Sequence, residues 1–343
     1  MKKTMRAVVF ESEGKTALKE IGIPEIRQPD DVIVEIEVCS ICGTDVKITD
    51  VPPGYAAEPG TVLGHEIVGT VVETGGNVRY LKKGDRVVVN PNDFCGVCRY
   101  CRDNMPNHCE NIEALGVFTH GGFAEYAKMP ERILYRIAPD LSARKAVFAE
   151  PLACILNGLD KIRLTAGDGA LVMGCGPIGL LVVQLLKASG ITPLIVSEPS
   201  ELRRNYALQC GADHAIDPRV QDPADFCQKT TGTGVDVVVE LVGSQLKTAV
   251  QAVRRRGNIL LFGLNTQVEP NVPQSEMIFK EIAVFGTWIA NASFSRAVKL
   301  LESDILDVER LVTHTYPLSK VEEGLRLLKS GEAIEILVDP KQD

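Results

Sequence analysis

Four cysteines lie close together in the middle of the chain, at Cys95, Cys98, Cys101 and Cys109, with the spacing C-x2-C-x2-C-x7-C. They fall in a segment rich in Pro, Asn, Gly and Asp that has too few apolar residues to form a core of its own. Four thiolates at this spacing can enclose one tetrahedral Zn²⁺, and metal binding can supply the folding energy that such a loop lacks. The pattern therefore predicts a structural zinc lobe over residues 90–112.

Disulfides and an iron–sulfur cluster are the alternatives for these cysteines. Four cysteines allow three disulfide pairings. The bacterial cluster sequence ends C-x3-C-P, whereas here the last gap is seven residues and Glu110 follows the final cysteine. The chain has ten cysteines, and its first residues, MKKTMRAVVF, contain no apolar run long enough for a signal peptide. We therefore expect a reducing cytoplasm, in which thiols bind metal or stay free.

Length, charge and hydrophobicity limit the class of protein. A chain of 343 residues is long enough for about two domains. Its net charge of −8 argues against nucleic acid or an anionic membrane as a main partner. The most apolar stretch, residues 169–186, contains several glycines and a proline. This composition favours a buried strand, turn and helix over a membrane span.

The periodicity of apolar residues changes along the chain. The first 90 residues contain β-branched runs between glycine-rich turns, at Arg6–Phe10, Val32–Val38, Ile67–Glu73 and Arg86–Asn90. From about Leu164, apolar strands alternate with helical segments; the strands are expected at Ala170–Met173, Pro193–Ser197, His214–Ile216, Val235–Glu240, Asn258–Phe262 and Ala283–Gly286. The alternation predicts an α/β domain with a parallel sheet. The tail has two helical patterns and a short strand, at Phe294–Glu302, Lys320–Lys329 and Ile334–Val338.

A glycine-rich turn joins the first strand of the alternating region to an apolar helix. It reads G-x-G-x-x-G and comprises Gly174, Gly176, Pro177, Ile178 and Gly179. The first glycine permits the tight turn, the second lets a pyrophosphate approach, and the third lets the helix pack on the strand. The N–H groups of the helix N-terminus then face the phosphates. In this strand–turn–helix setting the motif predicts a dinucleotide site.

Glu198 closes the next strand, nineteen residues after the last glycine of the motif, where a ribose-binding acid is expected. A carboxylate there accepts hydrogen bonds from the ribose hydroxyls and repels a 2′-phosphate, which favours NAD over NADP. Arg203 and Arg204 lie close by in sequence and could accept that phosphate, so NADP stays the less favoured alternative.

Separate segments offer ligands for a second metal site: Cys42, His65, Glu66 and Glu150. Cysteine, histidine and glutamate are all good Zn²⁺ ligands. Each also has an ordinary alternative: Cys42 as a small buried residue, His65 as a hydrogen-bonded core histidine, and Glu150 at a helix N-terminus.

The order of these motifs along one chain resembles the zinc-dependent medium-chain dehydrogenases of the alcohol dehydrogenase superfamily, in their polyol (sorbitol-type) and threonine dehydrogenase branch. The motifs are Cys42-Gly43-Thr44-Asp45, Gly64-His65-Glu66, the four-cysteine lobe, Glu150-Pro151 and Gly174–Gly179. The resemblance implies a β-rich GroES-like catalytic domain over residues 1–155 and 293–343, and a doubly wound Rossmann domain over 156–292.

It also implies a catalytic zinc held by Cys42, His65 and either Glu66 or Glu150. Zinc would act as a Lewis acid on the substrate hydroxyl while hydride passes to the nicotinamide. The hydroxyl of Thr44 would carry the first proton outward, and Lys47 stands where relatives often have the histidine of the outer relay. Asp45 would orient a metal ligand.

Other positions bear on the cofactor crevice and the substrate. Val242 and Leu264 follow two of the expected parallel strands, where chain borders the crevice. Gly286 and Thr287 stand at or near the places of an Arg-Tyr pair that faces the polyol in sorbitol-type enzymes, and Glu335 replaces a lysine common in relatives. Tyr55, Phe118 and Trp288 are candidate cleft walls, and core packing is the alternative for each.

The resemblance implies an NAD-dependent dehydrogenase that oxidises a secondary alcohol of a polyol, with two Zn²⁺ per chain and a homodimeric or homotetrameric assembly. A threonine 3-dehydrogenase and a sugar-alcohol-phosphate dehydrogenase are the alternatives within the branch. A zinc-free quinone or enoyl reductase would lack Cys42, His65 and Glu66. A non-enzymatic sensor of zinc or NAD(H) is the alternative of another class.

Overall fold

The computed structural model describes residues 3–342. Contacts divide the chain into two compact units. Unit 1 comprises residues up to Ala153, Ala290–Asp304 and the chain from Val308, and unit 2 comprises Cys154–Ile289 and Ile305–Asp307. Within the described residues, no helix is both long and apolar enough to span a bilayer.

Unit 1 is built on a seven-stranded sheet. Its strands run in the order β16-β17-β3-β4-β5-β9, and β8 also pairs with β3. These strands are β3 (Asp31–Ser40), β4 (Glu66–Thr74), β5 (Arg86–Val89), β8 (Tyr126–Pro130), β9 (Leu134–Arg136), β16 (Val312–Tyr316) and β17 (Glu335–Val338). The hairpin of β1 (Thr4–Ser12) and β2 (Lys15–Gly22) forms a separate two-stranded sheet. Strands β1, β3 and β4 contain three of the predicted runs, and β5 ends at Val89, one residue before the end of the fourth. Strands β2, β8, β9 and β16 were not predicted.

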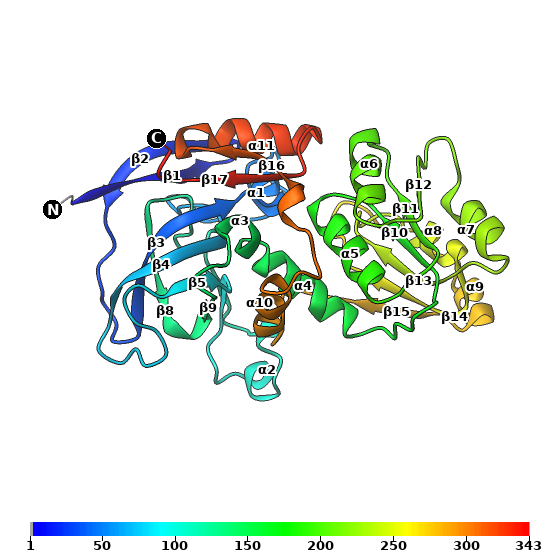
Figure 1. Ribbon diagram of the computed structural model, residues 1–343, viewed down its shortest axis with the longest axis horizontal. Coiled ribbons are helices and arrows are strands. Elements are labelled where there is room, and N and C mark those ends of the chain that lie inside the picture. Colours follow the sequence, from blue (N-terminus) through cyan, green and yellow to red (C-terminus); the bar gives the residue numbers. More distant parts are fainter. Residues whose placement is uncertain (1–2, 343) are drawn as a thin grey trace. The chain divides into compact units, whose positions relative to one another are not determined.

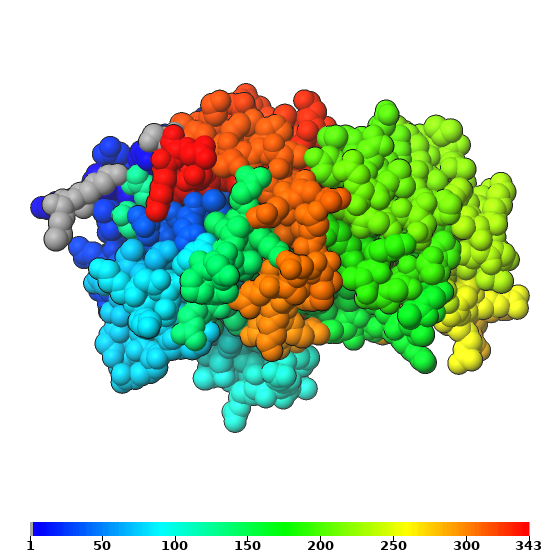
Figure 2. Space-filling view, in the orientation of Figure 1, coloured from blue at the N-terminus to red at the C-terminus, as the bar shows by residue number. Residues whose placement is uncertain are grey.

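The helices of unit 1 are short and lie around this sheet. They are α1 (Gly43–Ile48), α2 (Arg99–Arg102), α3 (Ala143–Ala146), α10 (Phe294–Leu301) and α11 (Val321–Ser330), with 3-10 turns η1 (Pro106–His108), η2 (Glu131–Ile133), η3 (Glu309–Leu311) and η4 (Leu318–Lys320). Helix α4 (Ala149–Leu159) runs across the boundary between the units. The red C-terminal end of the chain lies beside blue N-terminal residues (Figure 2). There β17 pairs with the end of β3, and Arg6 donates a hydrogen bond to the Pro340 carbonyl at 3.0 Å.

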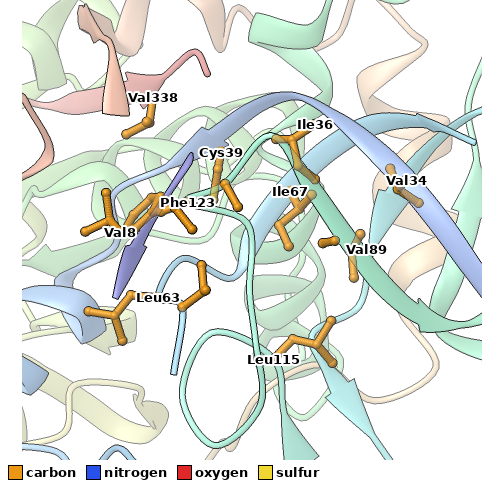
Figure 3. Packing of buried hydrophobic residues seen from close by; sticks show 14 of the residues in the cluster. Val8, Val34, Ile36, Cys39, Leu63, Ile67, Val89, Leu115, Phe123 and Val338 are labelled. Atoms are coloured by element: carbon orange, nitrogen blue, oxygen red, sulfur yellow. The ribbon is translucent and has the colours of Figure 1, made fainter. Parts of the chain in front are cut away.

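The core of unit 1 lies between the hairpin, the sheet and the segment around Phe123. Figure 3 shows Phe123 beside Val8 and Cys39, with Ile36 and Ile67 further along the sheet. These side chains are at most 2% exposed. Burial of large apolar side chains stabilises a fold by roughly 1.5–3 kcal/mol each, so this cluster gives the loops around it a rigid base.

Unit 2 is a parallel sheet with the strand order β12-β11-β10-β13-β14-β15. The strands are β10 (Ala170–Met173), β11 (Leu194–Ser197), β12 (His214–Ile216), β13 (Val235–Glu240), β14 (Val253–Leu261) and β15 (Ala283–Gly286). Four of the six have the predicted bounds. This order reverses between β10 and β13, as in a doubly wound dinucleotide-binding fold.

Helices cover both faces of this sheet. Helices α5 and α6 cover one face and α7 and α8 the other (Figure 1). Their bounds are α5 (Pro177–Ala188), α6 (Glu201–Gln209), α7 (Pro223–Thr231), α8 (Leu246–Ala252) and α9 (Gln274–Lys280). The caps of α7 follow from its sequence: the Asp222 side chain accepts the Asp225 N–H, Pro223 fills the first turn, and Gly232 ends the helix at φ 79°. A predicted α/β domain with a parallel sheet is confirmed.

Candidate active site

Cys42, His65 and Glu66 meet at one end of the unit 1 sheet. Cys42 lies two residues past β3 and is the N-cap of α1, and His65 directly precedes β4. The antiparallel register places Ser40 opposite Glu66, so these two strand ends lie side by side. Each of the three residues offers a ligand atom, and these atoms lie within 4.8 Å of one another.

The turn before His65 is fixed by close packing. Gly64 has φ +87°, a left-handed conformation that favours glycine. A Cβ at this position would lie 2.6 Å from the Phe123 ring and 2.8 Å from the Cys39 sulfur, the two core residues seen together in Figure 3. Any larger residue would displace the turn from the core, so the imidazole of His65 is held in place through the backbone.

The Asp45 carboxylate contacts two residues of this cluster, Cys42 and His65. It is fully buried, and its Oδ2 accepts the Cys42 N–H at 2.9 Å. Its Oδ1 lies 3.6 Å from Nδ1 of His65, and neither atom has a hydrogen-bond partner. Metal-binding histidines almost always donate their second N–H to a carboxylate or carbonyl. These two buried atoms are placed for that role if Nε2 of His65 binds a metal.

The electrostatics of the cluster also fit a cation. Burial and the charge of Glu66 raise the pKa of Cys42 to about 11. Burial and the charge of Glu150 raise the pKa of Glu66 to about 8. Buried acids that raise one another's pKa become anionic when a divalent cation binds between them. Thiolate, imidazole and carboxylate together form a donor set that suits Zn²⁺.

Two further predicted residues lie close to the cluster. Glu150 is 9% exposed in the first turn of α4, near enough for its charge to raise the pKa of Glu66. It is not among the three residues whose ligand atoms converge, so direct ligation by Glu150 stays a prediction. The Thr44 hydroxyl lies 3.8 Å from the Cys42 sulfur, on the first turn of α1. Lys47 follows on the same helix and packs along Gly54.

The four-cysteine lobe closes around its own sulfur cluster. It contains β6 (Asn92–Asp93), α2, η1 and β7 (Glu113–Ala114), and α2 lies at the tip of its projection from unit 1 (Figure 1). The Cys109 sulfur lies 3.5 Å from that of Cys95 and 4.0 Å from that of Cys98. All four sulfurs lie within 4.8 Å of one another. A tetrahedron with Zn–S bonds of about 2.3 Å has sulfurs about 3.8 Å apart, so the cluster fits one zinc.

Main-chain N–H groups favour a thiolate in this lobe. Hydrogen bonds from Val97 and Cys98 lower the pKa of Cys95 to about 6. The N–H groups of Cys95 and Asn111 point to the Cys109 sulfur, each at 3.4 Å. In contrast, desolvation raises the pKa of Cys101 to about 12. A divalent cation bound among the four sulfurs would favour the thiolate form of all four, including Cys101.

In unit 2 the glycine turn has the geometry that a pyrophosphate requires. Gly174 has φ +91°, and a Cβ on Gly179 would lie 2.2 Å from the Gly174 carbonyl oxygen. Gly176 is the N-cap of α5, and the space where its Cβ would lie is open. Pro177 and Ile178 form the first turn of the helix. The open space over a helix N-terminus fits a phosphate group.

The Glu198 carboxylate braces this turn through two main-chain hydrogen bonds. It is 4% exposed; its Oε2 accepts the Cys175 N–H at 2.7 Å and its Oε1 the Ser200 N–H at 2.9 Å. A carboxylate has about four acceptor positions, so capacity for ribose hydroxyls remains. The Nε of Arg203 is buried without a hydrogen-bond partner, and Arg204 donates to the Glu198 carbonyl. Sequence reasoning missed the bracing role of Glu198.

Three strand ends adjoin one another beside the glycine turn. A Cβ on Gly174 would lie 3.1 Å from the Val242 side chain, and one on Gly263 would lie 2.3 Å from the Gly243 nitrogen. Val242 and Leu264 are 45% and 44% exposed. Exposed apolar side chains at the carboxyl ends of parallel strands suit a crevice that receives a flat ring.

Two buried polar residues, Glu335 and Asn157, were given another meaning or missed by the sequence analysis. Glu335 is 3% exposed and accepts a short hydrogen bond from the Ser40 hydroxyl, and burial and the charge of Glu66 raise its pKa. Asn157 is 7% exposed on α4 and bonds to the segment after β15. Its sequence signal was a single amide within the apolar run of a helix.

Each half of the chain matches a known protein family model. Residues 28–139 match the family model "Alcohol dehydrogenase GroES-like domain", and residues 177–303 match "Zinc-binding dehydrogenase". The chain is 33% identical to D-arabinitol dehydrogenase 1 of Uromyces fabae, over 98% of this chain and 97% of that protein. It is 35% identical to L-threonine 3-dehydrogenase of Pyrococcus furiosus, over 93% of this chain and 94% of that one.

A solved structure extends the match to three dimensions. A zinc-binding dehydrogenase fold from Sinorhizobium meliloti 1021, bound to NADP, superposes with a TM-score of 0.94 at 32% identity, over 99% of this chain and 100% of that one. Together with the two domain matches and the near full-length relatives, this shows that the chain belongs to the zinc-dependent medium-chain dehydrogenases of the alcohol dehydrogenase superfamily, which are nicotinamide-dependent enzymes.

Proposed function

We propose that the protein oxidises a secondary alcohol of a polyol to a ketone and transfers the hydride to NAD⁺. The observation that carries the proposal is the convergence of Cys42, His65 and Glu66, with Asp45 behind His65. The D-arabinitol dehydrogenase relative supports a polyol as the substrate class.

In this proposal Cys42, His65 and Glu66 hold a catalytic Zn²⁺, and the four lobe cysteines hold a second one. Zinc held there would supply Lewis acidity to the substrate hydroxyl, and a bound nicotinamide would supply the hydride acceptor. Asp45 keeps the imidazole of His65 in one orientation. The Thr44 hydroxyl, beside Cys42, accepts the proton that the substrate hydroxyl loses and passes it outward toward Lys47. Glu150 acts as an additional carboxylate next to Glu66.

We propose NAD as the preferred cofactor because the Glu198 carboxylate is held rigidly by two main-chain N–H groups. A 2′-phosphate would have to lie against this fixed negative charge. The buried Nε of Arg203 and the NADP-bound structural relative keep NADP as the competing cofactor. Comparing kcat/KM for the two cofactors tests this preference.

Threonine is the second candidate substrate, because the Pyrococcus furiosus relative is 35% identical over nearly the whole chain. A screen by NADH fluorescence separates the candidates. It uses C4–C6 polyols, their phosphates, threonine and simple secondary alcohols with one enzyme preparation. A kcat/KM for threonine at least tenfold above that of every polyol would overturn the polyol assignment, and the highest value for a phosphate would move it to sugar-alcohol phosphates.

We further propose a cytoplasmic location and a homodimeric or homotetrameric assembly. None of the ten cysteines, all of which lie in the described residues, forms a disulfide, which supports a reducing compartment. Ile278 and Phe279 on α9 are 62% and 81% exposed, which supports an apolar contact with another copy. Light scattering after gel filtration measures the assembly. The domain limits 1–155 with 293–343, and 156–292, stay part of this proposal.

A further inference from the structure

Asn157 holds the segment that follows β15. Its side-chain amide donates to the Ile289 carbonyl at 2.7 Å, to the Trp288 carbonyl at 3.1 Å and to the Thr287 hydroxyl at 3.3 Å. Asn157 is 7% exposed, and its neighbour Gly158 lies so close to Thr287 that a Cβ would be 3.2 Å from that side chain. The two N–H bonds of this one buried amide are therefore shared among three consecutive residues.

The backbone of this segment has a strained conformation at Ile289. Ile289 has φ +37°, in the left-handed region that β-branched residues rarely enter. Such a conformation costs about 1–3 kcal/mol and persists only where surrounding contacts enforce it. The hydrogen bonds from Asn157 to the carbonyls on either side of this strained position supply that enforcement.

The segment lies where the nicotinamide end of a dinucleotide would be expected. Glu198, at the end of β11, marks the ribose of the adenosine half, and the glycine turn follows β10. Across the reversal of strand order, β13, β14 and β15 follow in sequence, and the Thr287 N–H donates to the Leu261 carbonyl at the end of β14. A dinucleotide lying across the carboxyl ends of the strands therefore has its nicotinamide half on the side of β13 to β15.

We infer that Asn157 is a positioning residue that shapes residues 287–289 into a binding surface for the nicotinamide carboxamide. The carboxamide has one donor and one acceptor group, which main-chain carbonyl and N–H groups at a strand end can match. The inference rests on the proposed use of a nicotinamide dinucleotide. It assigns to Asn157 no contact with the cofactor itself.

The test compares two ligands that differ only in the nicotinamide half. Asn157→Leu keeps a similar volume but removes the donor, so the strained segment relaxes. We expect the full-length variant to bind NADH about tenfold more weakly while its affinity for ADP-ribose stays within about twofold of wild type. NADH fluorescence titration and competition by ADP-ribose measure the two affinities. Asn157→Ala, which also lacks the donor, serves if the leucine variant is unfolded by circular dichroism.

Gln184→Leu is the matched control. Gln184 is another buried amide of unit 2, 7% exposed, that donates to the Asp307 carbonyl at 3.1 Å. We expect this control to lower the melting temperature. Its affinities for NADH and for ADP-ribose are expected to change by the same factor, if they change at all. A second check is Ile289→Gly, because glycine enters the left-handed region freely. In the Asn157→Leu background it is expected to restore part of the NADH affinity.

Unchanged NADH affinity in the Asn157 variants would overturn the inference, and so would an equal loss of NADH and ADP-ribose affinity. Wild-type protein that bound no NADH would overturn the proposed function together with this inference. Wild-type binding of NADH with an unaffected Asn157 variant overturns this inference alone.

Discussion

The Nδ1 atom of His65 lies 3.6 Å from the Oδ1 atom of Asp45, and both atoms are buried without a hydrogen-bond partner. A buried, unpaired polar atom is costly, because desolvation is not offset by a hydrogen bond. The pair is therefore arranged for a state in which Nε2 of His65 has a ligand and Nδ1 carries a proton. We propose that Asp45 links metal binding to the orientation of His65.

Replacing Asp45 by Asn tests this link. The amide keeps the shape of the side chain but removes the negative charge that supports His65. We expect zinc affinity at the Cys42 site to fall by about 10–100-fold, the range found for residues that orient metal ligands. Competition with a chromogenic chelator measures the affinity. Asp31→Asn is the control, because Asp31 is a buried carboxylate of the same unit that bonds to Arg27, Gln28 and Lys128 instead. An equal loss in both variants would argue against a specific role for Asp45.

The contacts of Glu198 predict that its substitution changes both the affinity for NADH and the preference for NAD over NADP. Glu198→Gln keeps one acceptor oxygen and turns the other into a donor, so one of the two main-chain N–H groups loses its partner. We expect weaker NADH binding, by roughly tenfold, and a smaller preference for NAD over NADP because the repulsive charge is gone. The ratio of kcat/KM for the two cofactors measures the preference. If the ratio stayed at the wild-type value, another residue would determine it.

Acid stability depends on the half-buried ion pair between Glu37 and Arg86. Burial alone would raise the pKa of Glu37, but hydrogen bonds from Arg86 and Thr70 and the charge of Arg86 outweigh burial and lower it below 4.5. A carboxyl group with a lowered folded pKa stabilises the protein above its unfolded pKa, and this contribution disappears as the pH falls through the folded pKa. We expect Glu37→Gln to be less stable than wild type at pH 7, with a difference that shrinks as the pH falls below about 4.5.

Urea unfolding at a series of pH values from 7 to the acid limit of the folded state measures this difference. Glu322→Gln is the control, because Glu322 is exposed and accepts only a hydroxyl hydrogen bond from Thr16. A stability gap between wild type and Glu37→Gln that was the same at every pH would show that shape, and not charge, determines the effect.

The lobe is expected to depend on its metal for structure. Cys109 is the most buried of its four cysteines and accepts N–H groups from Cys95 and Asn111. We expect Cys109→Ser to lose about one zinc per chain and to become sensitive to proteolysis within the lobe, since little apolar core remains there. Limited proteolysis with mass spectrometry locates the cuts. Cys227→Ser, a buried thiol of unit 2, is the control; cuts in the lobe of this variant would contradict the assignment.

Local sequence signals predicted the parts of the fold whose geometry is set by neighbouring residues. The glycine turn, β10 and β13 have the expected bounds because turn chemistry and apolar runs act over a few residues. Strand β14 begins at Val253 instead of Asn258, because its exposed start contains Arg254 to Arg256, which read as a polar connection. Strand β2 was missed for the same reason, since most of its residues are exposed or half-buried and polar.

The candidate active site could be predicted only in part. The spacing of the lobe cysteines and of the glycine motif is enough to predict their function. In contrast, Cys42 and His65 meet only because Ser40 pairs with Glu66 across two strands. Strand register is set by the whole sheet, so sequence spacing does not reveal it. The hydrogen bonds of Asn157 to Trp288 and Ile289 are likewise long-range and have no local signal beyond an isolated polar residue.

Zinc content is the measurement that tests most directly whether Cys42, His65 and Glu66 hold a catalytic metal. Plasma mass spectrometry on protein purified without chelators is expected to find about two zinc ions per chain in wild type and about one in Cys42→Ser, which loses turnover but keeps near-normal NADH affinity. About two zinc ions in Cys42→Ser, or only about one in fully active wild type, would contradict the assignment of this site.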